Sequence, residues 1–250
     1  ELQINKIMAS TSEVGHAKNV ANFQDLIEFV TAYGATYNPS KNSLKLPQLI
    51  ALKASADATL ADVITKNTNY NNKVNERITA FSGLKSLSTR LVNALQTTDA
   101  TTETIGNAKT FNRKMQGKKA SSSQTPTDPN TPAPNTISTS QQSYDQLIQH
   151  LAGLTSILEA ETSYTPNETD LQVATLQTKI ADLTAKNTAV ATAYASISNS
   201  RIARNETLYS SSTGLVETAN EVKKYIKSVF GASSPQFAQV KGIQFKIIKN

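Results

Sequence analysis

The stretch Leu60-Ala61-Asp62-Val63-Ile64-Thr65-Lys66-Asn67-Thr68 returns later in the chain as Ile180-Ala181-Asp182-Leu183-Thr184-Ala185-Lys186-Asn187-Thr188. Five of the nine positions are identical, and two more exchange one aliphatic residue for another. A match at such a long spacing indicates an internal repeat, in which each copy forms the same unit of secondary structure. We therefore take a tandem duplication as the first hypothesis about the fold.

Three further matches lie in the same order along the chain, which argues against chance. They pair residues 23–27 with 144–148, residues 36–39 with 163–166, and residues 103–117 with 217–231. The last match ends at Gly117 in the first copy and at Gly231 in the second, where a glycine with a positive φ is expected to end a helix.

The copies are joined by a segment rich in Pro, Ser and Thr. It contains four prolines and no run of apolar residues, so it cannot bury a face and is predicted to be a linker. The predicted organisation is an N-terminal extension at 1–16, helical repeat 1 at 17–117, the linker at 118–139, helical repeat 2 at 140–231 and a basic extended tail at 232–250.

Each copy is predicted to form three helices. In repeat 1, apolar residues recur at helical spacing from Lys18 to Tyr33. The second helix is long and carries a seven-residue apolar repeat, which favours left-handed packing of helix against helix. A third helix is expected from Leu84 to Met115, and its counterpart in repeat 2 from Thr213 to Phe230.

The expected fold class is all-α, an elongated helical bundle built from a tandem duplication of a three-helix unit. We expect the two repeats to pack as one bundle, because three helices with so few large apolar residues bury little surface alone. The alternative is two separate three-helix bundles joined by the linker.

Asn67 and Asn187 occupy the same core-facing position of the matched helices. A buried asparagine pair fixes the register of packed helices at some cost in stability. The two asparagines are candidates for such a polar register pair. The alternative is that each asparagine lies at the edge of the seam, in contact with water.

The tail changes character after Gly231. From Val240 to Ile247 apolar and polar residues alternate, which is the two-residue period of a β-strand. The tail is therefore predicted to be extended and able to form a strand. It would either dock on the bundle or fray, or it would add to the edge of a sheet in a partner protein.

The composition excludes several classes of chemistry. With no Cys and two His, the chain cannot form disulfides, thiol nucleophiles or three-histidine metal sites. No glycine-rich phosphate loop, nucleophile elbow or paired-histidine zinc motif is present. Glu13 and His16 have the Glu-x-x-His spacing of di-iron bundles, but the second motif that such a site needs is missing. We expect no catalytic residue, no metal and no cofactor, and hence no enzymatic activity.

The net charge of +6 is concentrated in two groups of cations. One lies toward the end of repeat 1, and the other lies at the end of repeat 2 and in the tail. The candidate residues for binding an anionic surface are Lys109, Arg113, Lys114, Lys118, Lys119, Lys223, Lys224, Lys227, Lys241 and Lys246. The alternative is that these cations only complement the negative ends of helix dipoles.

These observations favour a non-enzymatic helical-bundle protein with a structural or protein-interaction role, whose partner is expected to be a protein. The alternative function is peripheral binding of an anionic surface, either a membrane or a nucleic acid, through the basic helix ends and the tail. No apolar run is long enough to cross a bilayer, and we detect no signal peptide. Because the chain starts at Glu1 rather than Met, processed export remains open.

Overall fold

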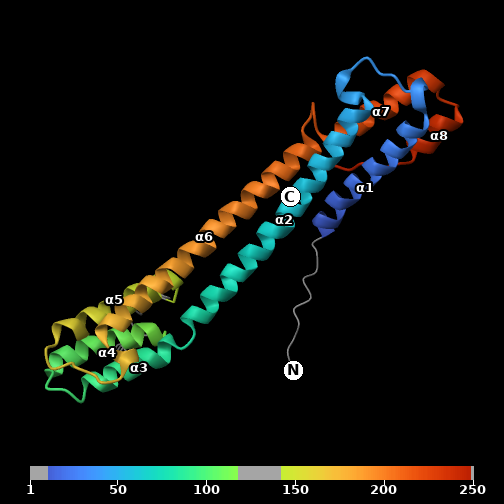
Figure 1. The fold of residues 1–250 in the computed structure, drawn as a ribbon. Coiled ribbons are helices and arrows are strands. Elements are labelled where there is room, and N and C mark those ends of the chain that lie inside the picture. Colours follow the sequence, from blue (N-terminus) through green and yellow to red (C-terminus); the bar gives the residue numbers. More distant parts are fainter. Residues whose placement is uncertain (1–10, 118–141, 249–250) are drawn as a thin grey trace, which may run out of the picture. The chain divides into compact units, whose positions relative to one another are not determined.

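The computed structural model describes residues 11–117 and 142–248, which are mostly helical (Figure 1). These residues contain no β-strand, so the predicted all-α class is confirmed. The helices are α1 (Thr11–Ala32), α2 (Leu46–Phe81), α3 (Leu84–Leu95), α4 (Thr102–Gln116), α5 (Tyr144–Ala160), α6 (Val173–Tyr209), α7 (Leu215–Phe230) and α8 (Pro235–Lys241). Three 3₁₀ turns lie in the connections: η1 (Gly34–Thr36), η2 (Asn42–Leu44) and η3 (Thr169–Leu171). None of these helices is both long and apolar enough to cross a membrane.

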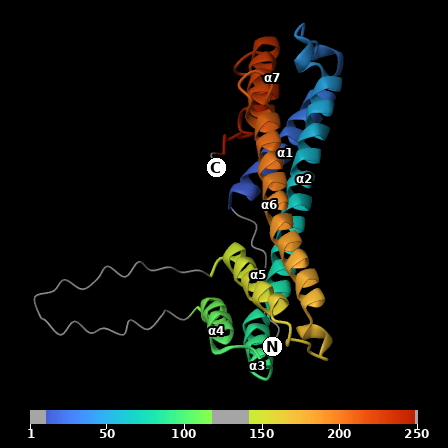
Figure 2. The same cartoon turned by 90° about the vertical axis from the view of Figure 1, so that its left-hand side faces the viewer.

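The described residues fall into two compact units, of which the first combines segments from both ends of the chain and the second is formed by the middle of the chain. Among the described residues, the first unit draws on 11–70 and 194–248, and the second on 71–117 and 142–193. Helices α1, α7 and α8 belong to the first unit, and α3, α4 and α5, which lie together in Figure 2, belong to the second. The units thus follow different boundaries from the predicted repeats, and each draws on both of them. The predicted linker at 118–139 lies outside the described residues.

The single third helix predicted from Leu84 to Met115 is wrong, because the chain divides it into α3 and α4. At the end of α3, the hydroxyl of Thr98 donates a hydrogen bond to the main-chain carbonyl of Leu95. Thr101 then caps α4 by accepting a hydrogen bond of 3.2 Å from the amide of Thr104. Threonine hydroxyls compete with helical hydrogen bonds in this way and favour helix ends over helix interiors.

The tail predicted to be extended from residue 232 instead begins with the helix α8. The hydroxyl of Ser234 accepts a hydrogen bond of 3.1 Å from the amide of Phe237, and Pro235 occupies the first helical turn. This combination of cap and proline is a strong start signal for a helix. Val240 and Lys241 are therefore helical, and the strand predicted across them is wrong for these residues.

Two glycines end helices as predicted. Gly117 follows α4 with φ of 74°, and Gly231 follows α7 with φ of 95°. The amide of Gly117 donates to the main-chain carbonyls of Arg113 and Lys114, and the amide of Gly231 donates to the main-chain carbonyl of Lys227. A positive φ is costly for any residue with a Cβ, so glycine is favoured at both positions.

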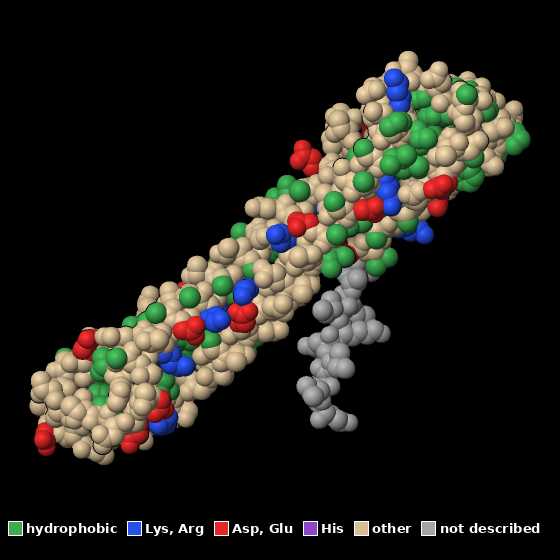
Figure 3. All heavy atoms as spheres, viewed as in Figure 1, with side chains coloured by type: hydrophobic (Ala, Val, Ile, Leu, Met, Phe, Trp, Pro, Cys, Tyr) green, Lys and Arg blue, Asp and Glu red, His purple; other side chains and the backbone are tan. Residues whose placement is uncertain are grey.

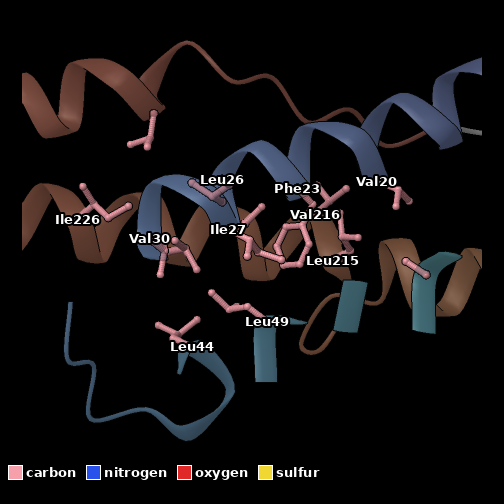
Figure 4. Packing of buried hydrophobic residues seen from close by; sticks show 14 of the residues in the cluster. Val20, Phe23, Leu26, Ile27, Val30, Leu44, Leu49, Leu215, Val216 and Ile226 are labelled. Carbon is pink, nitrogen blue, oxygen red and sulfur yellow. The ribbon is translucent and has the colours of Figure 1, made fainter. Parts of the chain in front are cut away.

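The core of the first unit forms where α1 packs against α7. Phe23 and Ile27 of α1 point toward Leu215 and Val216 of α7, and all four side chains are buried (Figure 4). Leu49 of α2 is also fully buried in this cluster. Each such side chain contributes about 1.5–3 kcal/mol relative to an exposed position, so the α1–α7 contact is a main source of stability for the unit.

Residues 243–248, which form neither a helix nor a strand, dock on α1. The side-chain amide of Asn19 pairs with the main chain of Lys246, donating to its carbonyl at 2.7 Å and accepting from its amide at 3.0 Å. One turn later, Asn22 donates to the carbonyl of Gln244 at 2.6 Å. The ring of Phe245 lies edge-on to that of Phe23, with centroids 6.5 Å apart. The side-chain amides of Asn19 and Asn22 thus form hydrogen bonds with the main chain of this segment, as the main chain of a neighbouring strand would in a sheet.

The first unit also contains a buried polar contact between α1 and α6. Arg204 is fully buried, and its guanidinium donates to both carboxylate oxygens of Glu13 at 2.7 and 2.8 Å. His16 shares a hydrogen bond of 2.6 Å with the hydroxyl of Tyr209. These pairings satisfy charged and polar groups that would be costly to bury alone.

The second unit has its own core, formed by α3, α4 and α5. Leu91 and Leu95 of α3, Met115 of α4, and Leu151 and Leu154 of α5 have no exposed surface. The ring of Phe111 on α4 lies directly over Gly153 on α5, where there is no room for a Cβ. Glycine at this position therefore allows α4 and α5 to approach closely.

Candidate functional site

The predicted anion-binding cations are gathered most densely on α7 and α8. The seven-residue step from Asn220 to Lys227 brings these side chains to one side of α7, with Lys223 between them. α8 follows α7 after a short turn and packs against it, which brings Phe237 and Lys241 to the same place. Residues that are up to 24 positions apart in sequence thus share one site.

These side chains line a hollow of about 410 Å³ in the first unit. Its lining consists of Glu217, Asn220, Lys223, Lys224, Lys227, Phe237 and Lys241. Four ammonium groups therefore surround the hollow with a single carboxylate. An uncompensated group of like charges attracts counter-ions, so the hollow is electrostatically suited to an anionic group. We refer to it below as the basic hollow.

Lys223 anchors the wall of the basic hollow. Its ammonium group donates to the carbonyl of Lys241 at 3.2 Å and to that of Ile243 at 2.8 Å, where the chain leaves α8. It also lies 6.0 Å from the ring centroid of Phe245. Partial burial lowers the pKa of Lys223 below its ordinary value of 10.5. This lysine therefore holds α7, α8 and the end of the chain together.

The remaining lysines of the basic hollow are open to solvent. Lys224, Lys227 and Lys241 are exposed, and none of them forms an ion pair within the described ranges. Lys227 lies 5.8 Å from the ring centroid of Phe237. Because no described carboxylate neutralises them, these ammonium groups can meet an anionic ligand without first breaking an ion pair.

Elsewhere on the surface, charges are more often balanced. On the face drawn in Figure 3, several basic side chains lie beside acidic ones. Lys53 pairs with Asp57 at 2.6 Å on α2, and Lys41 pairs with Glu221 at 2.6 Å. The basic hollow differs from these places because its cations outnumber its single acid.

In a second hollow, the basic side chains are paired with an acidic one. It has a volume of about 570 Å³, lies in the second unit, and includes Glu76 and Lys186 in its lining. The carboxylate of Glu76 accepts from Lys73 at 2.9 Å and from Lys186 at 3.1 Å. These hydrogen bonds lower the pKa of Glu76. The charges of this hollow are already paired, so it is a weaker candidate for binding an ion.

The other predicted cations do not join the basic hollow. Lys109, Arg113 and Lys114 lie on α4, in the second unit. Arg113 donates to the hydroxyl of Thr110 at 3.0 Å, and the last turn of α4 contains both Arg113 and Lys114. These two residues fit the helix-dipole alternative. Lys118 and Lys119 lie outside the described residues. Lys246 belongs to the segment that docks on α1 and does not line the hollow.

Asn67 and Asn187, the candidate register pair, have different surroundings. Both are half-buried. Asn187 accepts a hydrogen bond of 3.0 Å from Arg77 and donates one of 2.8 Å to Asp145. Asn67 forms no side-chain hydrogen bond with the part of the chain that the structure describes. Of the two, only Asn187 takes part in a polar network.

Glu13 and His16 belong to the buried contact with α6. Glu13 faces Arg204, and His16 faces Tyr209. Residues 11–117 and 142–248 contain no group of three or more His, Asp or Glu side chains that could hold a metal ion. The roles of Arg204 and Tyr209 are not evident from the sequence, because nothing in their local pattern indicates partners that lie 191 and 193 residues away.

Comparisons of the chain with protein-family models, with curated proteins and with solved structures found no match. Function is therefore inferred from the residues and contacts described above.

Proposed function

We propose that this protein is a non-enzymatic helical binding module, which uses the basic hollow between α7 and α8 to bind an acidic segment of a partner protein. The observation that carries the proposal is the set of exposed ammonium groups of Lys224, Lys227 and Lys241 around one concavity, none of which pairs with a carboxylate of residues 11–117 or 142–248. Carboxylates of a partner would form charge-assisted hydrogen bonds with them. The amide of Asn220 would be available to the main chain of the same segment.

The shape and composition of the hollow favour a protein segment over other polyanions. A nucleic-acid groove combines a basic track with several aromatic rings on which bases stack, whereas this hollow has one ring, that of Phe237. Peripheral membrane binding requires a broad apolar face beside the cations. A concavity that holds a few cations and a single ring suits a short acidic segment.

The groups with the most strongly shifted pKa values support a non-enzymatic role. Burial raises the pKa of Tyr37 and, to about 12, that of Tyr164. Each of these hydroxyls donates to a main-chain carbonyl, of Leu44 and Leu171 respectively, and neither lines the basic hollow. The perturbed groups therefore stabilise connections between helices, whereas catalytic sites gather such groups around a substrate pocket.

Binding can be tested by fluorescence anisotropy with a labelled oligoglutamate peptide as the probe. We expect the Lys224→Gln/Lys241→Gln variant to bind roughly fivefold more weakly at low salt, since each exposed pair contributes only a fraction of a kcal/mol to about 1 kcal/mol. Added salt should weaken the wild-type complex by screening. The matched control is Lys109→Gln/Arg113→Gln, which removes two exposed cations from α4 and should leave binding nearly unchanged.

Three results would overturn this proposal. Equal loss of binding in the two variants would show that net charge, and not the hollow, attracts the peptide. Equal binding of an oligoglutamine peptide would show that carboxylates are not recognised. Tighter, Lys224- and Lys241-dependent binding to vesicles containing phosphatidylserine, or to duplex DNA, would assign the same cations to an anionic surface instead.

We further propose that the described halves of the chain, residues 11–117 and 142–248, are copies of one ancestral unit. Tyr37 bonds to the carbonyl of Leu44 just before α2, and Tyr164 bonds to that of Leu171 just before α6. Within each matched helix, buried positions recur at the same spacing in both halves. The pairs are Phe23 and Leu151, Leu26 and Leu154, Leu49 and Leu176, Val63 and Val190, Leu84 and Leu215, Leu91 and Val222, and Leu95 and Ile226.

A pair of arginines near the ends of the long helices supports the same proposal. Arg77 of α2 lies over the ring of Tyr144 on α5, 4.0 Å from its centroid. Arg204 of α6 lies against Glu13 on α1. Each arginine thus reaches from the second helix of one half to the first helix of the other half. Two copies that had paired reciprocally before they were fused would have this arrangement.

A further inference from the structure

Two ion pairs of opposite polarity join the halves at neighbouring places, since Lys41 corresponds to Glu168, which precedes Asp170 by two residues. In the first unit, Lys41 next to η2 pairs with Glu221 of α7 at 2.6 Å. In the second unit, Asp170 of η3 pairs with Arg90 of α3. Arg90 directly precedes the buried Leu91, and Glu221 directly precedes the buried Val222, so the two helices present these charges at the same position. The N-terminal half (11–117) supplies both cations, and the C-terminal half (142–248) supplies both acids.

This distribution opposes pairing of either half with a copy of itself. Two N-terminal halves arranged in the same way would bring Lys41 against Arg90. Two C-terminal halves would bring Asp170 against Glu221. Like charges placed in contact disfavour a complex, and this is a common means of excluding wrong partners. Only the mixed pair places opposite charges together at both contacts.

The contact between α4 and α5 also disfavours pairing of two N-terminal halves, in this case by steric overlap. Phe111 of the N-terminal half lies over Gly153 of the C-terminal half, where a Cβ would overlap its ring. The corresponding position in the N-terminal half is Asp25, because Asp25 precedes the buried Leu26 as Gly153 precedes the buried Leu154. In a pair of two N-terminal halves, Phe111 would therefore meet a carboxylate in place of a glycine.

We infer that the two halves are dedicated partners: each carries an interaction surface that fits the other half and excludes a second copy of itself. The inference rests on the proposed correspondence between the halves and is independent of the proposed acidic ligand. The surface on the N-terminal half consists of Lys41, Arg90 and Phe111, and the complementary surface consists of Glu221, Asp170 and Gly153. Charge and shape select the same pairing at separate contacts.

The test uses the full-length protein with a specific protease site inserted between residues 118 and 141. The folded protein is cut at this site, unfolded in denaturant and refolded, and the pairs that form are counted by native mass spectrometry. Random association would leave only half of all pairs mixed. We expect mixed pairs to make up nearly all of them, with few pairs of two N-terminal or two C-terminal halves.

A double variant tests whether these particular residues, and not some other property of the halves, cause mixed pairs to form. Asp25→Gly/Arg90→Glu should allow pairs of two N-terminal halves, because the acid introduced at position 90 would attract Lys41 and the new glycine would make room for Phe111. The same changes should reduce mixed pairs, since the introduced acid would face Asp170. Lys85→Glu at an exposed position of α3 is the control for charge and should leave mixed pairs dominant. A statistical mixture from the wild type would overturn the inference, and so would undiminished mixed pairing by the double variant.

Discussion

The hydroxyl of Tyr164 donates a hydrogen bond of 3.0 Å to the main-chain carbonyl of Leu171, seven residues later. Tyr37 makes the corresponding bond to the carbonyl of Leu44 at 2.8 Å. All four residues are buried. Each bond closes the connection between the first helix of a half and the long helix that follows, so it fixes the point at which the long helix begins.

Burial of these hydroxyls predicts a loss of stability at alkaline pH. Burial, aided by Glu168 and Asp170, raises the pKa of Tyr164 from 10.0 to about 12, and burial also raises that of Tyr37. A raised pKa in the folded state means that the neutral hydroxyl is favoured there. The stabilisation is therefore complete below pH 10 and is lost as the pH rises from 10 through 12. Urea unfolding followed across this range should show a steady decrease in the free energy of unfolding.

Substitution separates this effect from general alkaline unfolding. Tyr164→Phe removes one buried hydrogen bond and should cost about 1 kcal/mol at neutral pH. Above pH 10 the variant should lose stability less steeply than the wild type, because it has one fewer tyrosine to ionise on unfolding. Tyr194→Phe, at a side chain that is 59% exposed, is the control and should leave the pH dependence unchanged. Parallel curves for Tyr164→Phe and the wild type would contradict the assignment.

The sequence was sufficient to predict the helical class, the long second helices and the glycine caps, because each depends on local patterns. It was not sufficient to choose between two possible alignments of the halves. The sequence match pairs Leu60 with Ile180, whereas the burial pattern pairs Val63 with Val190, which is a shift of seven residues. A helix with a seven-residue apolar repeat looks the same after such a shift. In the alignment by burial that we propose, Asn187 corresponds to Leu60, which accords with the different surroundings of Asn67 and Asn187.

The basic hollow could be predicted only in part. A count of charges located Lys223, Lys224, Lys227 and Lys241, but the strand-like alternation after residue 240 concealed the helix that brings Lys241 back to α7. The start signal was present in Ser234 and Pro235 and was outweighed by that alternation. The ion pairs between the halves could not be read from the sequence, because their partners are 80 or more residues apart.

The close approach of α4 and α5 predicts that Gly153 does not tolerate a side chain. Gly153→Ala would place a Cβ against the ring of Phe111, and overpacking of this kind costs about 1–3 kcal/mol. The matched control is Gly106→Ala on α4, where a Cβ would meet no described atom within 4 Å. That change should stabilise the protein by about 0.5–1 kcal/mol, because alanine favours a helix over glycine. Thermal unfolding monitored by circular dichroism measures both effects, and similar shifts in the two variants would refute the steric explanation.

The contact between Glu13 and Arg204 predicts a strong asymmetry between removing one partner and removing both. Glu13→Ala leaves the fully buried guanidinium without its carboxylate and should cost about 3 kcal/mol, at the lower end of the range for buried pairs because Glu13 is 32% exposed. Glu13→Leu/Arg204→Met replaces both charges by apolar groups and should be less destabilising than Glu13→Ala. The free energy of unfolding, measured in urea for both variants, tests this order of stability. If the double variant is the less stable of the two, the buried charge is not the cause.

The paired hydrogen bonds between Asn19 and Lys246 predict that a single side chain on α1 controls the order of the chain end. Asn19→Ala removes both bonds to the main chain of Lys246, and the segment from Ile243 to Ile248 should then exchange its amide hydrogens faster. Lys246 should show the largest change, since its amide donates directly to Asn19. The control is Asn93→Ala at an exposed position of α3, which should leave exchange in this segment unaltered. Hydrogen exchange followed by mass spectrometry of the C-terminal peptide measures the difference. Unchanged exchange in Asn19→Ala would mean that the apolar contacts of Phe245 and Ile248 hold the segment without the asparagine.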